Sequence, residues 1–284
     1  MKKGGTMDKI VKICGSVVQL GELNSRIYLM KLNQNKVDEL LPKLDDICIK
    51  NKYTKIFAKV PSRLKEEFEN AGYRGEAFIK EYFLDDDVLF MSKYFSDDRK
   101  TSKYPEKVRE VIDVAKSKKP VESIKSPKLD DSFSLNIACK DDAEELANLY
   151  KEVFETYPFP IYDPKYILET MDSHVIYFII KHSGKIVAAS SSEIDKENRC
   201  VEMTDFAVLP EYQGYGLAQN LLFAMEDEMR KNGIRVAYTI ARALSFGMNI
   251  TFAKLGYEHT GTLVNNTNIC GKLEDMNVWY KPLK

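Results

Sequence analysis

The chain has few histidines, no long apolar run and no excess of charge, and each shortage excludes a class of protein. The three histidines, His174, His182 and His259, do not form a ligand cluster, so no metal site is expected. No apolar stretch approaches the roughly 20 residues that span a membrane. The 42 basic and 43 acidic residues give a net charge of −1, without the positive excess of nucleic-acid-binding proteins. We therefore expect no metal, membrane or nucleic-acid partner.

The cysteines argue against a disulfide-stabilised protein. They are odd in number, scattered and without Cys-x-x-Cys spacing: Cys14, Cys48, Cys139, Cys200 and Cys270. The first five residues are basic, but no long apolar core of a secretory signal follows them. These features predict reduced thiols in a cytoplasmic protein.

The length and the composition allow two domains. With 284 residues and 44% hydrophobic side chains, the chain can form one large core or two modest ones. Residues 101–131 are largely polar and begin with a short helix predicted over residues 105–116. We therefore expect an N-terminal domain with its linker helix at residues 8–125 and a C-terminal domain at 132–284.

Hydrophobic periodicity in the C-terminal part predicts strands that alternate with helices. Stretches rich in β-branched and aromatic residues predict strands at residues 133–139, 175–181, 185–194, 199–208, 236–240, 257–264 and 273–280. Apolar residues at helical spacing predict helices that begin near residues 141, 164, 216 and 245. The order β-α-α-β-β-β-α-β-α-β-β predicts an α/β (α+β) domain with a mixed sheet.

The most informative segment is the loop Gln213–Ala218, which follows an apolar strand and precedes an amphipathic helix. The first backbone N–H groups of a helix have no intrahelical partner, so a helix start after a glycine loop binds anions well. No third glycine completes a dinucleotide fingerprint, and no Gly-Lys-Ser/Thr completes a P-loop. The loop is therefore a phosphate-binding turn of another kind, or a purely structural turn.

The spacing Gln-x-x-Gly-x-Ala of this loop resembles the pyrophosphate loop of the GCN5-related N-acetyltransferases (GNAT), and the order of elements matches their fold. The resemblance implies acetyl-coenzyme A as cosubstrate, an N-acetyltransferase activity and no metal. In that family the fourth and fifth strands of the domain separate and hold the pantetheine arm. The cofactor contacts that the resemblance implies are Phe206, Ala207, Val208, Gln213, Gly214, Tyr215, Gly216, Leu217, Ala218, Asn249 and Phe252.

Acetyl transfer to an amine needs a base, because a lysine-type amine with a pKa of about 10.4 is almost entirely protonated near neutral pH. The family often uses a glutamate at the offset of Glu202, and we expect Glu202 to be this base. Strict alternation along the strand places Glu202, Thr204, Phe206 and Val208 on one face. It places Asp205, the weaker candidate, on the opposite face.

The proton donor for the departing thiolate is not evident from the sequence. Phe252 occupies a position where many relatives have a tyrosine, and a phenyl ring cannot donate a proton. Water, Ser245 or Tyr238 are the alternatives. Cys200 shares the predicted face of Glu202, but no histidine lies nearby to activate it, so a buried cysteine is favoured over an acyl carrier.

The acceptor is indicated by the last third of the chain. The segments Gly-Thr-Leu-Val-Asn-Asn-Thr-Asn-Ile at 261–269 and Met-Asn-Val-Trp-Tyr-Lys at 276–281 resemble the β-lysine N6-acetyltransferases. That resemblance implies acetylation of the terminal amine of β-lysine, which gives the compatible solute N6-acetyl-β-lysine. It also implies a lysine 2,3-aminomutase as supplier of the substrate, and it is compatible with a homodimer.

A zwitterionic diamine needs a cation for its carboxylate, polar groups for its second amine and apolar walls for its methylene chain. Arg242 is the candidate for the carboxylate. Asn266 and Asn268, with the adjacent Asn265, are the polar candidates, although such segments are often turns. Tyr157 and Phe159, with the nearby Tyr162, are the candidate walls, although these aromatic side chains could simply fill the core.

The N-terminal part contains a weak internal repeat. Phe68 and Phe252 each begin the motif Phe-x-x-x-Gly-Tyr after a strand and a short helix. We therefore expect residues 8–95 to form a smaller, degenerate GNAT-like α/β domain that is not catalytic, because it has no glycine loop of the required spacing. Two alternatives to the β-lysine enzyme stay open: an acetyltransferase for another amine, and a coenzyme A-binding sensor without turnover.

Overall fold

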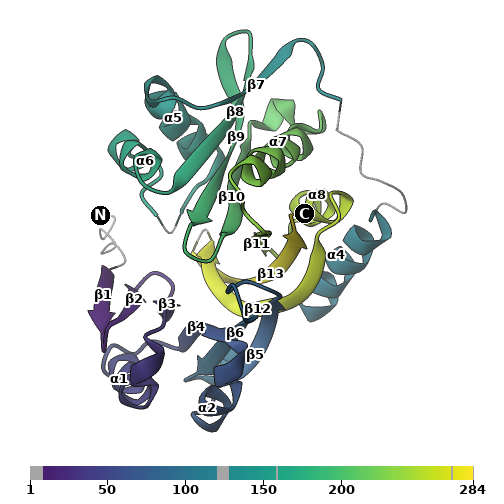
Figure 1. Cartoon of the computed structure of the whole chain (residues 1–284). Coiled ribbons are helices and arrows are strands. Elements are labelled where there is room, and N and C mark those ends of the chain that lie inside the picture. The colour runs from purple at the N-terminus through teal and green to yellow at the C-terminus, as the bar shows by residue number, and fades with distance from the viewer. Residues whose placement is uncertain (1–8, 120–127, 158, 270, 284) are drawn as a thin grey trace, which may run out of the picture. The chain divides into compact units, whose positions relative to one another are not determined.

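The computed structural model describes residues 9–119, 128–157, 159–269 and 271–283, and the chain divides into two compact units (Figure 1). Unit 1 comprises residues 1–105 and 260–276, and unit 2 comprises 106–259 and 277–284. Helix α4 (Pro105–Ser117), expected in the N-terminal domain, therefore groups almost entirely with unit 2. The predicted end of that domain, at residue 125, lies outside the described residues.

Unit 2 contains the elements of the predicted catalytic domain. Its seven-stranded sheet has the order β12-β13-β11-β10-β9-β8-β7. The strands are β7 (Phe133–Ile137), β8 (Val175–His182), β9 (Lys185–Asp195), β10 (Cys200–Val208), β11 (Val236–Arg242), β12 (Glu258–Ile269) and β13 (Lys272–Pro282). The helices are α5 (Ala143–Val153), α6 (Pro164–Met171), α7 (Leu217–Lys231) and α8 (Phe246–Lys254). The order is the predicted one, and the last two strands are longer than predicted.

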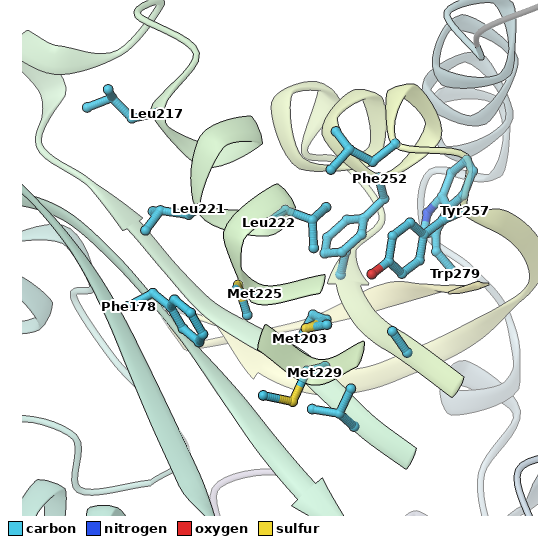
Figure 2. Close-up of a cluster of buried hydrophobic side chains, with 14 of the residues drawn as sticks. Phe178, Met203, Leu217, Leu221, Leu222, Met225, Met229, Phe252, Tyr257 and Trp279 are labelled. Carbon is cyan, nitrogen blue, oxygen red and sulfur yellow. The ribbon is translucent and has the colours of Figure 1, made fainter. Parts of the chain in front are cut away.

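Two separate apolar clusters cover the two faces of this sheet. Helices α5 and α6 pack on one face of β8–β10, and α7 packs on the other (Figure 1). Helix α7 is amphipathic, and its buried side chains lie on one stripe at helical spacing. Figure 2 shows part of this stripe, with Leu222 next to Phe252 and with Leu221 and Met225 toward Phe178. The clusters fix which side of the sheet each strand residue faces.

Unit 1 repeats the strand order of unit 2. Its strands are β1 (Lys9–Ile13), β2 (Ser16–Gly21), β3 (Arg26–Lys31), β4 (Lys55–Pro61), β5 (Arg74–Ile79) and β6 (Val88–Tyr94). Its helices are α1 (Val37–Lys50), α2 (Lys65–Asn70) and the short α3 (Asp97–Lys100). The sheet order β1-β2-β3-β4-β6-β5 corresponds to β8-β9-β10-β11-β13-β12, and β3–β4, like β10–β11, is a parallel pair.

The repeated Phe-x-x-x-Gly-Tyr motif has the same geometry in both units. The rings of Phe68 and Tyr73 lie 5.1 Å apart at 72°, and those of Phe252 and Tyr257 lie 5.0 Å apart at 74°. In both cases the tyrosine N–H donates to the phenylalanine carbonyl, and the intervening glycine has a positive φ. The predicted repeat is thus present in strand order and in this detail, whereas the link from β3 to α1 contains no glycine.

A buried ion pair holds strand β12 within unit 1. Lys55 Nζ lies 3.0 Å from Glu76 Oε2 and donates to the carbonyl of Val264 at 2.8 Å. Glu76 Oε1 accepts the N–H of Val264 at 3.1 Å, and Glu76 also accepts from Ser92 and Tyr94. Because β12 begins in unit 2 and continues in unit 1, this network anchors a strand that belongs to both units.

We predict that Glu76→Gln destabilises the protein by about 3 kcal/mol, because it leaves the buried Lys55 ammonium without its counter-charge. Burial alone would raise the pKa of Glu76, but the charge of Lys55 and the hydrogen bonds from Ser92 and Tyr94 hold it below 4.5. The contribution is therefore present above pH 4.5 and is lost as the pH falls. Urea unfolding between pH 3.5 and 7 measures it.

The control is Glu69→Gln, which makes the same change on an exposed glutamate that pairs with Lys65. It should change the unfolding free energy by less than about 0.5 kcal/mol. Equal stability of the two variants at pH 7 would show that the network does not anchor β12.

Candidate active site

A β-bulge in β10 determines the geometry of the site. Thr204 pairs with Ser191 of β9, and the next pair is Ala207 with Ala189, so β10 advances three residues while β9 advances two. Asp205, in the bulge, has a left-handed φ of 55°. The extra residue reverses the alternation of side chains along the second half of the strand.

The prediction that Glu202, Thr204, Phe206 and Val208 share one face is therefore wrong. Phe206 and Val208 pack against the cluster under α7, together with Met203, whereas Ala207 belongs to the cluster under α5 and α6. The residues before the bulge keep the opposite alternation, which places Glu202 and Thr204 on the α5/α6 side.

Asp205 was also placed on the wrong face by the sequence. Its carboxylate accepts hydrogen bonds from the hydroxyl groups of Ser191, at 2.5 Å, and Tyr157. These partners lie on the α5/α6 side, so Asp205 is on the same side of the sheet as Glu202. No local pattern marks a bulge at this position, so the sequence does not predict Ser191 as a partner of Asp205.

Beyond Glu202, strands β10 and β11 separate. The parallel pairs are Cys200–Val236, Val201–Ala237 and Glu202–Tyr238. In this fully described stretch β10 continues to Val208 and β11 to Arg242, without further pairing between them. The backbone of β10 after Glu202 therefore presents an open edge to which an extended ligand could bind. We call this separation of β10 and β11 the fork. Glu202 lies where the fork begins, and it is half-buried and opposite Glu193 on β9.

The predicted phosphate loop lies beside this fork in the sequence and leads into α7. Gly214 and Gly216 both have positive φ, 88° and 72°, and a Cβ on either would meet open space. The first N–H group of α7 that donates within the helix is that of Gln219. The N–H groups of Leu217 and Ala218, which come before it, have no acceptor within the helix. Gln213 and Tyr215 are exposed. These groups fit an anionic diphosphate.

Two predicted cofactor residues have a structural role here. Asn249 donates to the carbonyls of Arg242 and Ser245 and accepts from Asn277 and Trp279, at 2.7–3.0 Å. These bonds use both donors and both acceptor sites of the side-chain amide. The predicted contact of Asn249 with the cofactor stays a prediction. Phe252 is fully buried and packs edge-to-face on Phe206, with ring centroids 5.6 Å apart.

The predicted acceptor residues are divided between the units. Tyr157, Phe159 and Arg242 belong to unit 2, with both aromatic side chains against the α5/α6 cluster and Arg242 at the exposed end of β11. Asn266 and Asn268 belong to unit 1. The side chain of Asn268 donates to the carbonyl of Leu23, whereas the side-chain oxygen of Asn266 is buried without a hydrogen-bond partner.

Comparison with known proteins identifies the fold and the reaction. A model described as "Acetyltransferase (GNAT) family" matches residues 143–257. The chain is 53% identical over 275 residues to the beta-lysine N(6)-acetyltransferase of Methanococcus maripaludis. The aligned region covers 97% of this chain and 99% of that protein. The chain belongs to the GNAT acetyltransferase family.

Two further relatives of this GNAT acetyltransferase also match over most of their length. The beta-lysine N(6)-acetyltransferase of Methanosarcina mazei is 34% identical, over 87% of this chain and 98% of that protein. The N-acetyltransferase YodP of Bacillus subtilis is 32% identical, over 98% of this chain and 100% of that protein. Both matches extend beyond residues 143–257, so the relatives share unit 1 as well.

As a GNAT acetyltransferase, the protein is an enzyme that takes its acetyl group from acetyl-CoA. In the described part of the chain no group of three or more His, Cys, Asp or Glu side chains could hold a metal ion. Over the same residues, every helix is too short or too polar to cross a membrane.

We predict that Ala218→Glu weakens coenzyme A binding by about 100-fold or more, because it places a carboxylate beside the first N–H groups of α7. Titration calorimetry with coenzyme A measures the loss. The control is Asn232→Glu, which adds the same charge at the exposed C-terminal end of α7. If both variants bind coenzyme A as the wild type does, the loop is only a structural turn.

The burial of Asp205 predicts a stability that depends on pH. Burial raises the pKa of Asp205 above 3.8, although hydrogen bonds from Ser191, Tyr157 and Thr204 oppose the rise. A carboxyl with a raised pKa in the folded state loses its contribution as the pH rises through that pKa. Asp205→Asn, which cannot ionise, should therefore gain stability relative to the wild type from pH 4 to pH 7. A difference in unfolding free energy that does not change with pH would contradict this.

Proposed function

We propose that this enzyme transfers acetyl from acetyl-CoA to the terminal (N6) amine of β-lysine and forms N6-acetyl-β-lysine. The observation that carries the proposal is the extent of the similarity to the Methanococcus maripaludis enzyme, which covers 97% of this chain at 53% identity. Residues 143–257 alone would support acetyl transfer to many amines. The similarity of unit 1 and of the last strands is what favours one acceptor.

The fork and the loop supply the binding site for acetyl-CoA in this proposal. The open backbone edge of Phe206, Ala207 and Val208 holds the pantetheine arm, in the way that a strand edge holds a peptide. The loop Gln213–Ala218 and the start of α7 hold the diphosphate. Acetyl-CoA supplies an activated thioester carbonyl, and the protein's task is to bring a neutral amine to it.

Glu202 is the base of the proposed reaction. An amine with a pKa of about 10.4 is neutral in about one molecule in a thousand at pH 7.4, a cost of roughly 4 kcal/mol. Glu202 is half-buried at the start of the fork, where a carboxylate can take the proton directly or through a water molecule.

The departing thiolate cannot take its proton from Phe252. Ser245 caps α8, where its oxygen accepts from the N–H of Met248. Tyr238 lies opposite Glu202 in the last parallel pair. We therefore propose Tyr238, rather than Ser245, as the hydroxyl nearest to the chemistry, with water as the alternative donor.

In this proposal Arg242 pairs with the acceptor carboxylate, and Tyr157 and Phe159 flank its methylene chain. Asn266 and Asn268, the predicted polar contacts, belong to unit 1, and their role stays a prediction. We further propose that the enzyme acts in the cytoplasm, as a homodimer, on β-lysine made by a lysine 2,3-aminomutase, and that its product serves as an osmoprotectant.

The test is to incubate the purified protein with acetyl-CoA and, separately, with β-lysine, α-lysine, spermidine and a lysine peptide. Thiol release and product mass are read together. Preferential release with β-lysine, acetylated at N6, is the expected result. Thiol release only with another amine would support acetyl transfer but would mean that β-lysine is not the substrate. The similarity to YodP, which is named only as an N-acetyltransferase, is compatible with that outcome.

We predict that Glu202→Gln lowers kcat by about 100- to 1,000-fold and leaves coenzyme A affinity unchanged, because the amide cannot accept a proton. Steady-state rates and calorimetry on the same preparation separate the two quantities. Asp227→Asn, on an exposed carboxylate of α7, is the control and should keep full activity. A coenzyme A sensor would instead bind and show no turnover in all three proteins.

A further inference from the structure

Asp205 is a buried carboxylate without a positive partner. Its side chain lies in the bulge of β10, and the residue is 8% exposed. Its hydrogen-bond donors are neutral hydroxyl groups, those of Ser191, Tyr157 and Thr204. Among the described residues, no lysine or arginine is a partner of this carboxylate. A buried anion is costly unless a cation compensates it, so this carboxylate calls for a cation that the protein itself does not supply.

The hydroxyl group of a second buried residue on this side of the sheet has no hydrogen-bond partner. Tyr150 of α5 is fully buried, and its hydroxyl oxygen has no hydrogen-bond partner. Tyr150 lies in the same α5/α6 cluster as Tyr177, with ring centroids 6.5 Å apart, and Tyr157 packs against this cluster. Burial, followed by the charge of Asp205, raises the pKa of Tyr150. Buried hydroxyl groups are rarely left unpaired, and a hydroxyl oxygen accepts the N–H of an ammonium group well.

The surroundings of Asp205 are suited to an organic cation. Tyr157 donates to the carboxylate, and Tyr166 and Tyr177 belong to the same α5/α6 cluster. Burial raises the pKa of all three tyrosines most, and the charge of Asp205 raises it further, after that of Glu193 in the case of Tyr166. Aromatic faces attract ammonium groups and also shield them from water. Glu193 adds a second negative charge that acts on the same three tyrosines.

The position of Asp205 relative to Glu202 matches a diamine. The two residues lie on the same side of the sheet, three residues apart, which corresponds to about 10 Å along a strand. In β-lysine four carbons separate the N6 and β-amine nitrogens, a span of about 6 Å when extended, and a hydrogen bond adds about 3 Å. An acceptor whose N6 lies at Glu202 can therefore bring its second nitrogen to Asp205.

We propose that Asp205 binds the second ammonium group of the acceptor, with Tyr157 and Tyr150 beside it, and so makes the enzyme selective for amines with two positive charges. The inference rests on the proposed function and deepens it, because it assigns the recognition of the β-amine to one residue. Asp205 is thus a specificity-determining residue, and Glu202 remains the base.

The test compares β-lysine with 6-aminohexanoate, which is the same molecule without the β-amine, in the wild type and in Asp205→Asn. The wild type should prefer β-lysine by about 100-fold in kcat/KM, the loss expected when one partner of a buried charge pair is removed. In Asp205→Asn this preference should fall below about 5-fold, mainly through a higher KM for β-lysine. The rate with 6-aminohexanoate should change little.

A parallel loss with both substrates would overturn the proposal, because it would mean that Asp205 supports the fold or the chemistry rather than the β-amine. An unchanged preference would overturn it as well. Asp227→Asn is the matched control for the change of carboxylate to amide, and it should keep the preference of the wild type.

If Asp205→Asn does not fold, the wild type alone decides. In 1,4-diaminobutane four carbons also separate the two nitrogens, but the carboxylate is absent. If Asp205 binds the second ammonium group, 1,4-diaminobutane should be a better acceptor than 6-aminohexanoate. The opposite order would overturn the proposal. Failure of the proposed function is a separate result: the wild type would then acetylate β-lysine no faster than α-lysine or spermidine, whatever the effect of Asp205→Asn.

Discussion

The bulge in β10 is the constraint on which the rest of the site depends. One extra residue between Thr204 and Ala207 brings Asp205 to the side of Glu202 and turns Phe206 and Val208 toward α7. The same strand loses its pairing with β11 immediately after Glu202. A carboxylate, an open backbone edge and a buried second carboxylate thus occur within seven residues, because the strand is irregular where a regular sheet would satisfy all its groups internally.

Unit 1 has the sheet architecture of unit 2 without its glycine loop. Both sheets have the same strand order, and Phe68–Tyr73 packs as Phe252–Tyr257 does. Unit 1 replaces the glycine loop by a short 3-10 turn, so its helix α1 does not begin with an open anion site. Its polar core is instead used for the Lys55–Glu76 pair, which holds the backbone of Val264 in β12.

Local pattern predicted the elements well, and it failed where an irregularity or a long-range contact decides the outcome. The strands, the helices and the loop Gln213–Ala218 follow from periodicity and glycine placement, which are short-range properties. The shared face of Glu202 and Phe206 was wrong because a bulge shifts the register by one residue without a sequence signature. The structural partners of Asn249, Asn277 and Trp279, could not be predicted locally because they are 28 and 30 residues away, and its contact with the cofactor stays a prediction.

The sequence by itself determined the order of elements, the glycine loop before α7 and, through resemblance, the family and its cosubstrate. These depend on residues that are neighbours in the chain. Only the tertiary structure decided that Asp205 is buried beside Tyr157 and Ser191 without a cation, that Tyr150 lacks a partner, and that residues 260–276 group with the N-terminal unit. The physical reason is that burial and charge compensation depend on segments far apart in the chain, and no local spacing records where they meet.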